Sequence, residues 1–91
     1  MLESEIEKKV KAYAKSKGWL PFKFSSPNHR GVPDGIFIRS GCVFFIEFKQ
    51  LGKKPTKLQR LTIDKITSQN IKVFICDSVE SGKEIINAYE K

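Results

Sequence analysis

The segment IFIRSGCVFFIEF (36–48) constrains the fold more than any other part of the chain, because it contains two apolar runs around a short turn sequence. The runs are rich in Ile, Phe and Val, which favour β-strands. Between them, Ser40-Gly41 is typical of a two-residue hairpin turn. We therefore predict two antiparallel strands, at roughly 34–39 and 42–49.

The hairpin fixes which polar side chains face each other. A two-residue turn pairs Arg39 with Cys42, so the numbers of facing residues sum to 81. Asp34 and Glu47 then lie opposite each other, with Cβ atoms about 4.5–5.5 Å apart. Lys49 joins them because strand side chains alternate between the two faces. A three-residue loop without a bulge would shift the register and separate these side chains.

The remaining sequence shows the patterns of three helices and two further strands. Apolar residues recur every three or four positions in the helices, and Pro21 confines the first strand to a sheet edge or a bulge. The predicted elements are a helix at 2–17, a strand at 19–24, a loop at 25–33, a helix from Pro55 to about 68, a strand at 71–76 and a helix after Ser78. This α-β-β-β-α-β-α order predicts a single α/β domain (1–91) with helices packed on a mixed sheet.

The charge of the chain indicates a polyanionic partner. There are 17 Lys and Arg residues against 10 acidic residues, which gives a formal net charge of +7 over 91 residues. Nucleic acid is the leading candidate for the partner, and the alternative is that the lysines only keep a small protein soluble. Lys greatly outnumbers Arg, which favours contacts to phosphates over specific contacts to bases.

The sequence shows no pattern of membrane insertion or of a disulfide framework. No apolar run approaches the length of a membrane span, and the charged N-terminal segment is unlike a signal peptide. We expect a cytosolic protein without a membrane partner. Cys42 and Cys76 lie in apolar runs without metal-ligand spacing, and we interpret them as small buried side chains.

The facing carboxylates of Asp34 and Glu47 indicate a divalent metal site. Two like charges opposite each other repel, and a cation offsets that repulsion. Carboxylate oxygens suit Mg²⁺ or Mn²⁺, which can activate a water molecule and neutralise charge on a phosphoryl group. Lys49 is placed to hold that water or to stabilise the transition state. The alternative is a turn Asp and a solvated Glu/Lys pair, but the apolar neighbours in VFFIEFK favour burial.

Pro33-Asp34 followed by Glu47-Phe48-Lys49 resembles the signature of the PD-(D/E)xK nuclease superfamily. Within that superfamily, RGVPDG and FFIEFKQLGKKPTKLQ are similar to the virus-type replication-repair nuclease (VRR-NUC) domain. The resemblance spans nearly the whole chain, from an acid in the first helix to Gln59 in the second. RGVPD before the strand and Gln59 after it make the match fairly specific.

This resemblance implies a restriction-endonuclease-like fold and a Mg²⁺-dependent DNA endonuclease, for which Mn²⁺ can substitute. Such an enzyme is a structure-selective hydrolase that cuts phosphodiester bonds in branched replication or recombination DNA, similar to a Holliday-junction resolvase. It is commonly a homodimer. The short chain resembles the stand-alone phage-type version, which implies a location in the cytoplasm of a bacterium or of a phage-infected host.

The resemblance also implies the residues of the site. The metal ligands would be Asp34, Glu47 and the main-chain carbonyl of Phe48. The catalytic residues would be these two acids with Lys49, Gln59 and an acid of the first helix.

For the helix acid we choose Glu3, because it falls near the buried stripe of the first helix whereas Glu5 points to one side. The alternative is an ordinary first-turn acid that complements the helix dipole. Gln59 is expected to orient the lysine, the water or a phosphate, and a solvated helix residue would fit the sequence equally well.

Two basic segments, NHRG (28–31) and GKKPTK (52–57), flank the predicted metal-bearing strands. Their cations are expected to bind the phosphate backbone, although loop charges are also often only solvated. The DNA-binding candidates are Arg30, Lys53, Lys54 and Lys57. His29 receives no catalytic role, because a lone loop histidine is more often incidental.

Two other functions remain open at the level of sequence. One is a noncatalytic nucleic-acid-binding module with structural acids, and the other is a nuclease domain that a second subunit targets to DNA. For assembly we expect a homodimer, because Trp19, Phe22 and Phe24 lie on a strand that Pro21 directs to the sheet edge.

Overall fold

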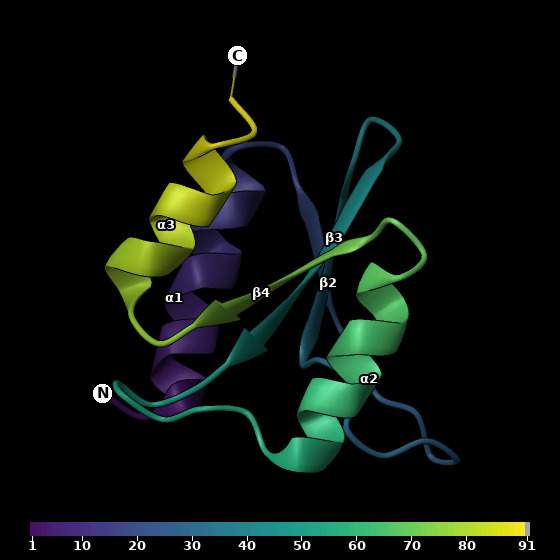
Figure 1. Cartoon of the computed structure of the whole chain (residues 1–91). Coiled ribbons are helices and arrows are strands. Elements are labelled where there is room, and N and C mark those ends of the chain that lie inside the picture. Colours follow the sequence, from purple (N-terminus) through teal and green to yellow (C-terminus); the bar gives the residue numbers. More distant parts are fainter. Residues whose placement is uncertain (91) are drawn as a thin grey trace.

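Figure 1 shows the computed structural model of the chain, which describes residues 1–90, as a mixed sheet between helices. The order of elements is the predicted α-β-β-β-α-β-α, so the α/β prediction is confirmed. The elements are α1 (Glu3–Ser16), β1 (Leu20–Lys23), β2 (Gly35–Arg39), β3 (Cys42–Phe48), α2 (Lys57–Thr67), β4 (Lys72–Cys76) and α3 (Val79–Asn87). Across residues 1–90, none of the helices combines the length and apolar character that a membrane crossing requires.

The four strands lie in the order β1-β2-β3-β4. β1 and β3 both run antiparallel to β2, whereas β4 runs parallel to β3. At the β2–β3 turn, Ser40 and Gly41 have φ angles of 48° and 79°, as a primed two-residue turn requires. Arg39 pairs with Cys42 and Gly35 with Ile46, so the predicted register is confirmed.

One face of the sheet is covered by α1 and α3, which lie side by side in Figure 1. Gly82 of α3 lies so close to α1 that a Cβ atom there would collide with the Val10 side chain. The core fills the space between these helices and the sheet with fully buried apolar side chains, among them Ile6, Val10, Ala14, Phe37, Phe44, Ile46 and Ile86. This apolar layer holds β2 and β3 in fixed positions.

Trp19 is part of this core and not part of the edge strand, which begins only at Leu20. Its side chain is 2% exposed and packs edge-on against Phe44 and Tyr89, at centroid distances of 4.9 Å and 5.2 Å. The main-chain N–H of Trp19 donates to the carbonyl of Ala14, which turns the chain back onto the helix side of the sheet before β1 begins.

Within residues 1–90, α2 is the helix that covers the other face of the sheet, and it packs mainly on β4 (Figure 1). β1 lies at the far edge, and its Leu20 and Phe22 side chains are 58% and 53% exposed. They pair with Ile38 and Ile36, on the face opposite the core. An apolar strip of β1–β3 is therefore left open beside α2.

Candidate active site

The confirmed hairpin register brings Asp34 and Glu47 together at one end of the sheet. Gly35 pairs with Ile46, so the next facing pair along the hairpin is Asp34 with Glu47. Asp34 accepts a hydrogen bond at Oδ2 from the main-chain N–H of Phe48 over 2.9 Å. The carboxylate of Asp34 is therefore fixed to the strand that carries Glu47.

Glu47 points away from the core, toward α2, although its neighbours on β3 point into the core. It is 2% exposed, and its Oε2 atom accepts a hydrogen bond from Nε2 of Gln59 over 3.0 Å. Nζ of Lys49 lies 3.3 Å from the same oxygen. The structure thus gathers Asp34, Glu47, Lys49 and Gln59, four of the residues that the sequence assigned to the site.

The environment of Glu47 disfavours its ionised form. Burial, followed by the charge of the Asp34 carboxylate, raises the pKa of Glu47 from 4.5 to about 7, although the ammonium of Lys49 acts in the opposite direction. A perturbed carboxyl group with a defined charge partner is characteristic of functional sites.

The two candidate acids of α1 occupy different environments. Glu5 accepts a hydrogen bond at Oε1 from the main-chain N–H of Leu2 over 3.0 Å, which makes it part of the helix cap. Glu3 is solvent-exposed, and its charge makes a small contribution to the raised pKa of Glu47. This arrangement favours Glu3 over Glu5.

α2 positions Gln59 through its first turn. Thr56 is the N-cap residue: its side chain accepts from the main-chain N–H of Gln59, and the side-chain oxygen of Gln59 accepts from the N–H of Thr56 over 2.9 Å. This reciprocal capping box uses one end of the Gln59 amide and leaves its NH₂ group for Glu47. The sequence suggested an orienting role for Gln59 but not this one.

The loop before Asp34 is docked on α2 by its main chain. Gly31 has a φ of 83°, and a Cβ atom there would lie 2.9 Å from the carbonyl oxygen of Leu58. Thr62, which is 4% exposed, donates from Oγ1 to the carbonyl of Arg30 over 3.2 Å. Sequence reasoning gave Thr62 no role, and its only signal was a hydroxyl on the side of α2 that faces the sheet.

The predicted phosphate-binding cations are all solvent-exposed. Arg30 lies in the β1–β2 loop, Lys53 and Lys54 lie in the β3–α2 loop, and Lys57 begins α2. Both loops lie toward the end of the molecule where β3 ends (Figure 1). The cations therefore lie in the segments that lead into and out of the carboxylate pair.

The donor set fits magnesium better than a metal that needs many protein ligands. Over residues 1–90, no three or more His, Cys, Asp or Glu side chains are grouped as a metal site. The carboxylate pair offers two protein ligands, and the hydrogen bonds described above engage only Oδ2 of Asp34 and Oε2 of Glu47. Mg²⁺ commonly binds through one or two carboxylates, with water and substrate phosphates completing the shell.

Comparison with known proteins identifies the family. "Putative nuclease p44" of Acyrthosiphon pisum secondary endosymbiont phage 1 is 34% identical to the chain over 77 residues, which cover 84% of this chain and 83% of that protein. A solved structure described as a VRR_NUC domain matches with a TM-score of 0.88 and 25% identity, covering 96% of both chains. The chain belongs to the VRR-NUC family. No family model matches the sequence.

Membership of the VRR-NUC family makes the protein a nuclease-type hydrolase. The resemblance to the VRR-NUC family, which rested on RGVPDG and on Glu47-Phe48-Lys49, is thereby confirmed. One connected cluster surrounds the buried Glu47 of this VRR-NUC chain. It consists of Asp34, Lys49 and Gln59.

Proposed function

We propose that this VRR-NUC protein is a Mg²⁺-dependent endodeoxyribonuclease that cuts branched replication or recombination DNA, with Mn²⁺ able to replace Mg²⁺. The observation that carries the proposal is the placement of Lys49 and Gln59 on one oxygen of a buried glutamate that faces a second carboxylate. A protein that only binds DNA gains nothing from buried acids near phosphates, since their charge repels the ligand.

The two carboxylates have the role of metal ligands in this proposal. Asp34 and Glu47 would hold the ion, with the main-chain carbonyl of Phe48 as a further oxygen. When bound, the ion polarises the scissile phosphate and lowers the pKa of a coordinated water.

Lys49 and Gln59 act through defined contacts. Glu47 holds the ammonium of Lys49 beside the site, where it orients the attacking water or donates to a phosphate oxygen as negative charge develops. Gln59 fixes Oε2 of Glu47 and so directs the other carboxylate oxygen. Glu3 adds a further negative charge that favours retention of a cation.

The basic loops supply affinity for the DNA backbone. Arg30, Lys53, Lys54 and Lys57 would contact phosphates on both sides of the scissile bond, and the net charge of +7 supports binding that weakens as salt is added. Selectivity for branched DNA rests on the family likeness rather than on these contacts, because phosphate contacts carry no sequence information.

The proposal is tested by cleavage of Holliday-junction, flapped, duplex, single-stranded and closed circular DNA, each with Mg²⁺, with Mn²⁺ and with EDTA. We expect cutting of branched DNA that requires the ion, and nicking of circular DNA, which requires no free end. Equal cutting in EDTA would overturn the metal assignment, and equal rates on duplex and branched DNA would overturn the selectivity.

A further inference from the structure

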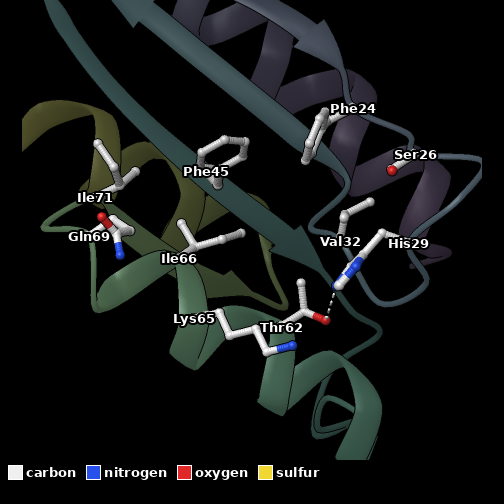
Figure 2. Close-up of a pocket in the computed structure, with 10 residues that line it drawn as sticks. All are labelled: Phe24, Ser26, His29, Val32, Phe45, Thr62, Lys65, Ile66, Gln69 and Ile71. Carbon is white, nitrogen blue, oxygen red and sulfur yellow. Dashed lines mark hydrogen bonds between the residues drawn. The ribbon is translucent and has the colours of Figure 1, made fainter.

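An apolar pocket lies between the sheet and α2 (Figure 2). Its volume is about 460 Å³, and its walls are formed by Phe24, Phe45, Val32, Ile66 and Ile71. We call it the Phe24–Phe45 pocket. It exists because α2 packs mainly on β4 and leaves the neighbouring strands uncovered.

The pocket and the active site share two elements, β3 and α2. Phe45 is two residues before Glu47 on β3 and shares its face, which places them roughly 7 Å apart along the strand. On α2, Thr62 lines the pocket one turn after Gln59, which contacts Glu47. A ligand group in the pocket would therefore be an immediate neighbour of a phosphate held at Glu47.

The lining suits a flat ring with polar edges. The rings of Phe24 and Phe45 lie 5.3 Å apart at an angle of 49°, so they form a tilted aromatic wedge. Aromatic side chains of this kind stack nucleobases without regard to sequence. His29, Gln69 and the hydroxyl of Ser26 stand around the apolar walls in Figure 2, where they can bond the edge of a base.

The charge around the pocket also matches a nucleotide. Lys65 lines the pocket from α2 and is solvent-exposed, so it can reach a phosphate while the base lies inside. Imidazole Nε2 of His29 lies 3.5 Å from the hydroxyl oxygen of Thr62, on the side of the pocket nearest the active site. No acidic side chain contributes to the lining among residues 1–90.

We propose that the Phe24–Phe45 pocket receives one unstacked nucleobase of the DNA, next to the phosphate that is cut. The inference rests on the proposed nuclease function and assigns that function a substrate requirement. A base enters such a pocket only after leaving its stack, which is least costly where the base is already unpaired. Unpaired nucleotides at a branch or flap therefore meet the requirement more readily than a continuous duplex.

The test measures binding without cleavage. A flapped duplex is prepared with one abasic nucleotide at successive positions around the junction, and affinity is measured by fluorescence anisotropy with Ca²⁺ in place of Mg²⁺. For the unmodified protein we expect one position at which loss of the base weakens binding about 5- to 150-fold, the range for one stacked base. Equal affinity for the intact DNA and for every abasic DNA overturns the proposal.

Variants assign that effect to the pocket. Phe24→Ala should weaken binding of intact DNA by a similar factor and should make the protein insensitive to the abasic position. Leu61→Ala is the matched control, because it removes a large apolar side chain from an exposed position of α2 that lies outside the pocket. Abasic discrimination that survives Phe24→Ala, or is lost equally in Leu61→Ala, contradicts the assignment.

A second pair of variants covers the case in which Phe24→Ala does not fold. Ile66→Trp fills the pocket from α2 and should abolish abasic discrimination, whereas Leu61→Trp adds the same side chain at an exposed position of the same helix. If Ile66→Trp lowers the sedimentation mass and leaves discrimination intact, a second copy of the chain covers the pocket and the proposal is wrong. If the protein discriminates against abasic DNA but does not cleave DNA in Mg²⁺, the proposed nuclease function is wrong and the base-binding pocket stands. If the protein cleaves DNA but does not discriminate, the base-binding pocket is wrong and the nuclease function stands.

Discussion

Gln59 donates a hydrogen bond from Nε2 to Oε2 of Glu47, and its side-chain oxygen accepts another from the main-chain N–H of Thr56. One amide therefore joins the start of α2 to the acid in the sheet. Gln59 therefore both caps α2 and orients Glu47. These two functions can be tested separately, because Thr56 takes part in the same cap but does not bond Glu47.

We expect Gln59→Ala and Thr56→Ala each to lower the free energy of unfolding by about 1 kcal/mol, the usual effect of losing a helix cap. Only Gln59→Ala should lower kcat/KM, by roughly 10- to 100-fold, because only Gln59 orients a metal-binding carboxylate. Denaturation curves and cleavage rates measure the two effects. Equal loss of activity in both variants would show that Gln59 acts through helix stability alone.

Asp34→Asn and Glu47→Gln are expected to abolish Mg²⁺-dependent cleavage while preserving DNA binding. Each change removes the charge of a metal-binding group without leaving a void, and an asparagine oxygen can still accept from the N–H of Phe48. Affinity for DNA should stay equal or increase, since a repulsive charge is lost. Asp64→Asn, at an exposed position of α2, is the control and should cut normally. Full activity in either site variant would remove that acid from the mechanism.

Lys49→Ala should reduce kcat far more than it raises KM. A cation that interacts more strongly with the transition state than with the bound substrate changes the rate and not the affinity. Lys49→Arg keeps the charge but changes the geometry, and it should recover only part of the rate. Single-turnover kinetics on a branched substrate separate the two parameters. A change confined to KM would make Lys49 a phosphate contact only.

The raised pKa of Glu47 makes stability depend on pH in the absence of divalent ions. Below pH 4.5 the carboxyl group is protonated in both states, and between pH 4.5 and about 7 the folded state alone keeps the proton. The folded state therefore loses stability as pH rises through this window, by about 3 kcal/mol in total. Above about pH 7 the loss is complete.

Glu47→Gln removes the titrating group. In EDTA, the free energy of unfolding of the variant should therefore rise relative to that of the natural protein between pH 5 and pH 8. Urea denaturation at each pH measures the difference. Addition of Mg²⁺ at pH 8 should stabilise the natural protein and not the variant. Parallel stability curves for the two proteins would show that Glu47 ionises at its ordinary pKa.

The sequence predicted the parts of this site that depend on local rules. Ser40-Gly41 specifies a turn type, the turn specifies the register, and the register places Asp34 opposite Glu47. The choice between core and edge for Trp19 depends on how the turn after α1 directs the chain, which no turn type or register specifies. The docking of Gly31 on α2 likewise depends on where the helix lies over the sheet, which no local pattern encodes.

The pocket beside the site shows the same limit. Phe24 and Phe45 are 21 positions apart in the sequence and meet only because β1, β2 and β3 are neighbours in the sheet. Local propensity identifies both residues as strand-like and apolar, which suggests a core or an interface. That they remain accessible follows from the position of α2 over β4.

The last prediction is that the protein forms a homodimer through the edge strand β1. Leu20 and Phe22 are large apolar side chains, both more than half exposed, on a strand that has no neighbour on its outer side within residues 1–90. An edge of this kind invites pairing with another chain, and twofold symmetry is the commonest closed arrangement. Two copies joined there would place two carboxylate pairs in one assembly, which suits cutting two strands near a branch point.

Sedimentation equilibrium at micromolar concentration should therefore give twice the 10.4 kDa mass of the chain. Phe22→Lys should shift the equilibrium toward the monomer, because a charge at the centre of an apolar contact loses its hydration on association. Leu61→Lys, at a similarly exposed apolar residue of α2, controls for the general effect of an added charge and should leave the mass unchanged. A single species at 10.4 kDa for the natural protein would refute the dimer and leave one active site, which can cut only one strand in each binding event.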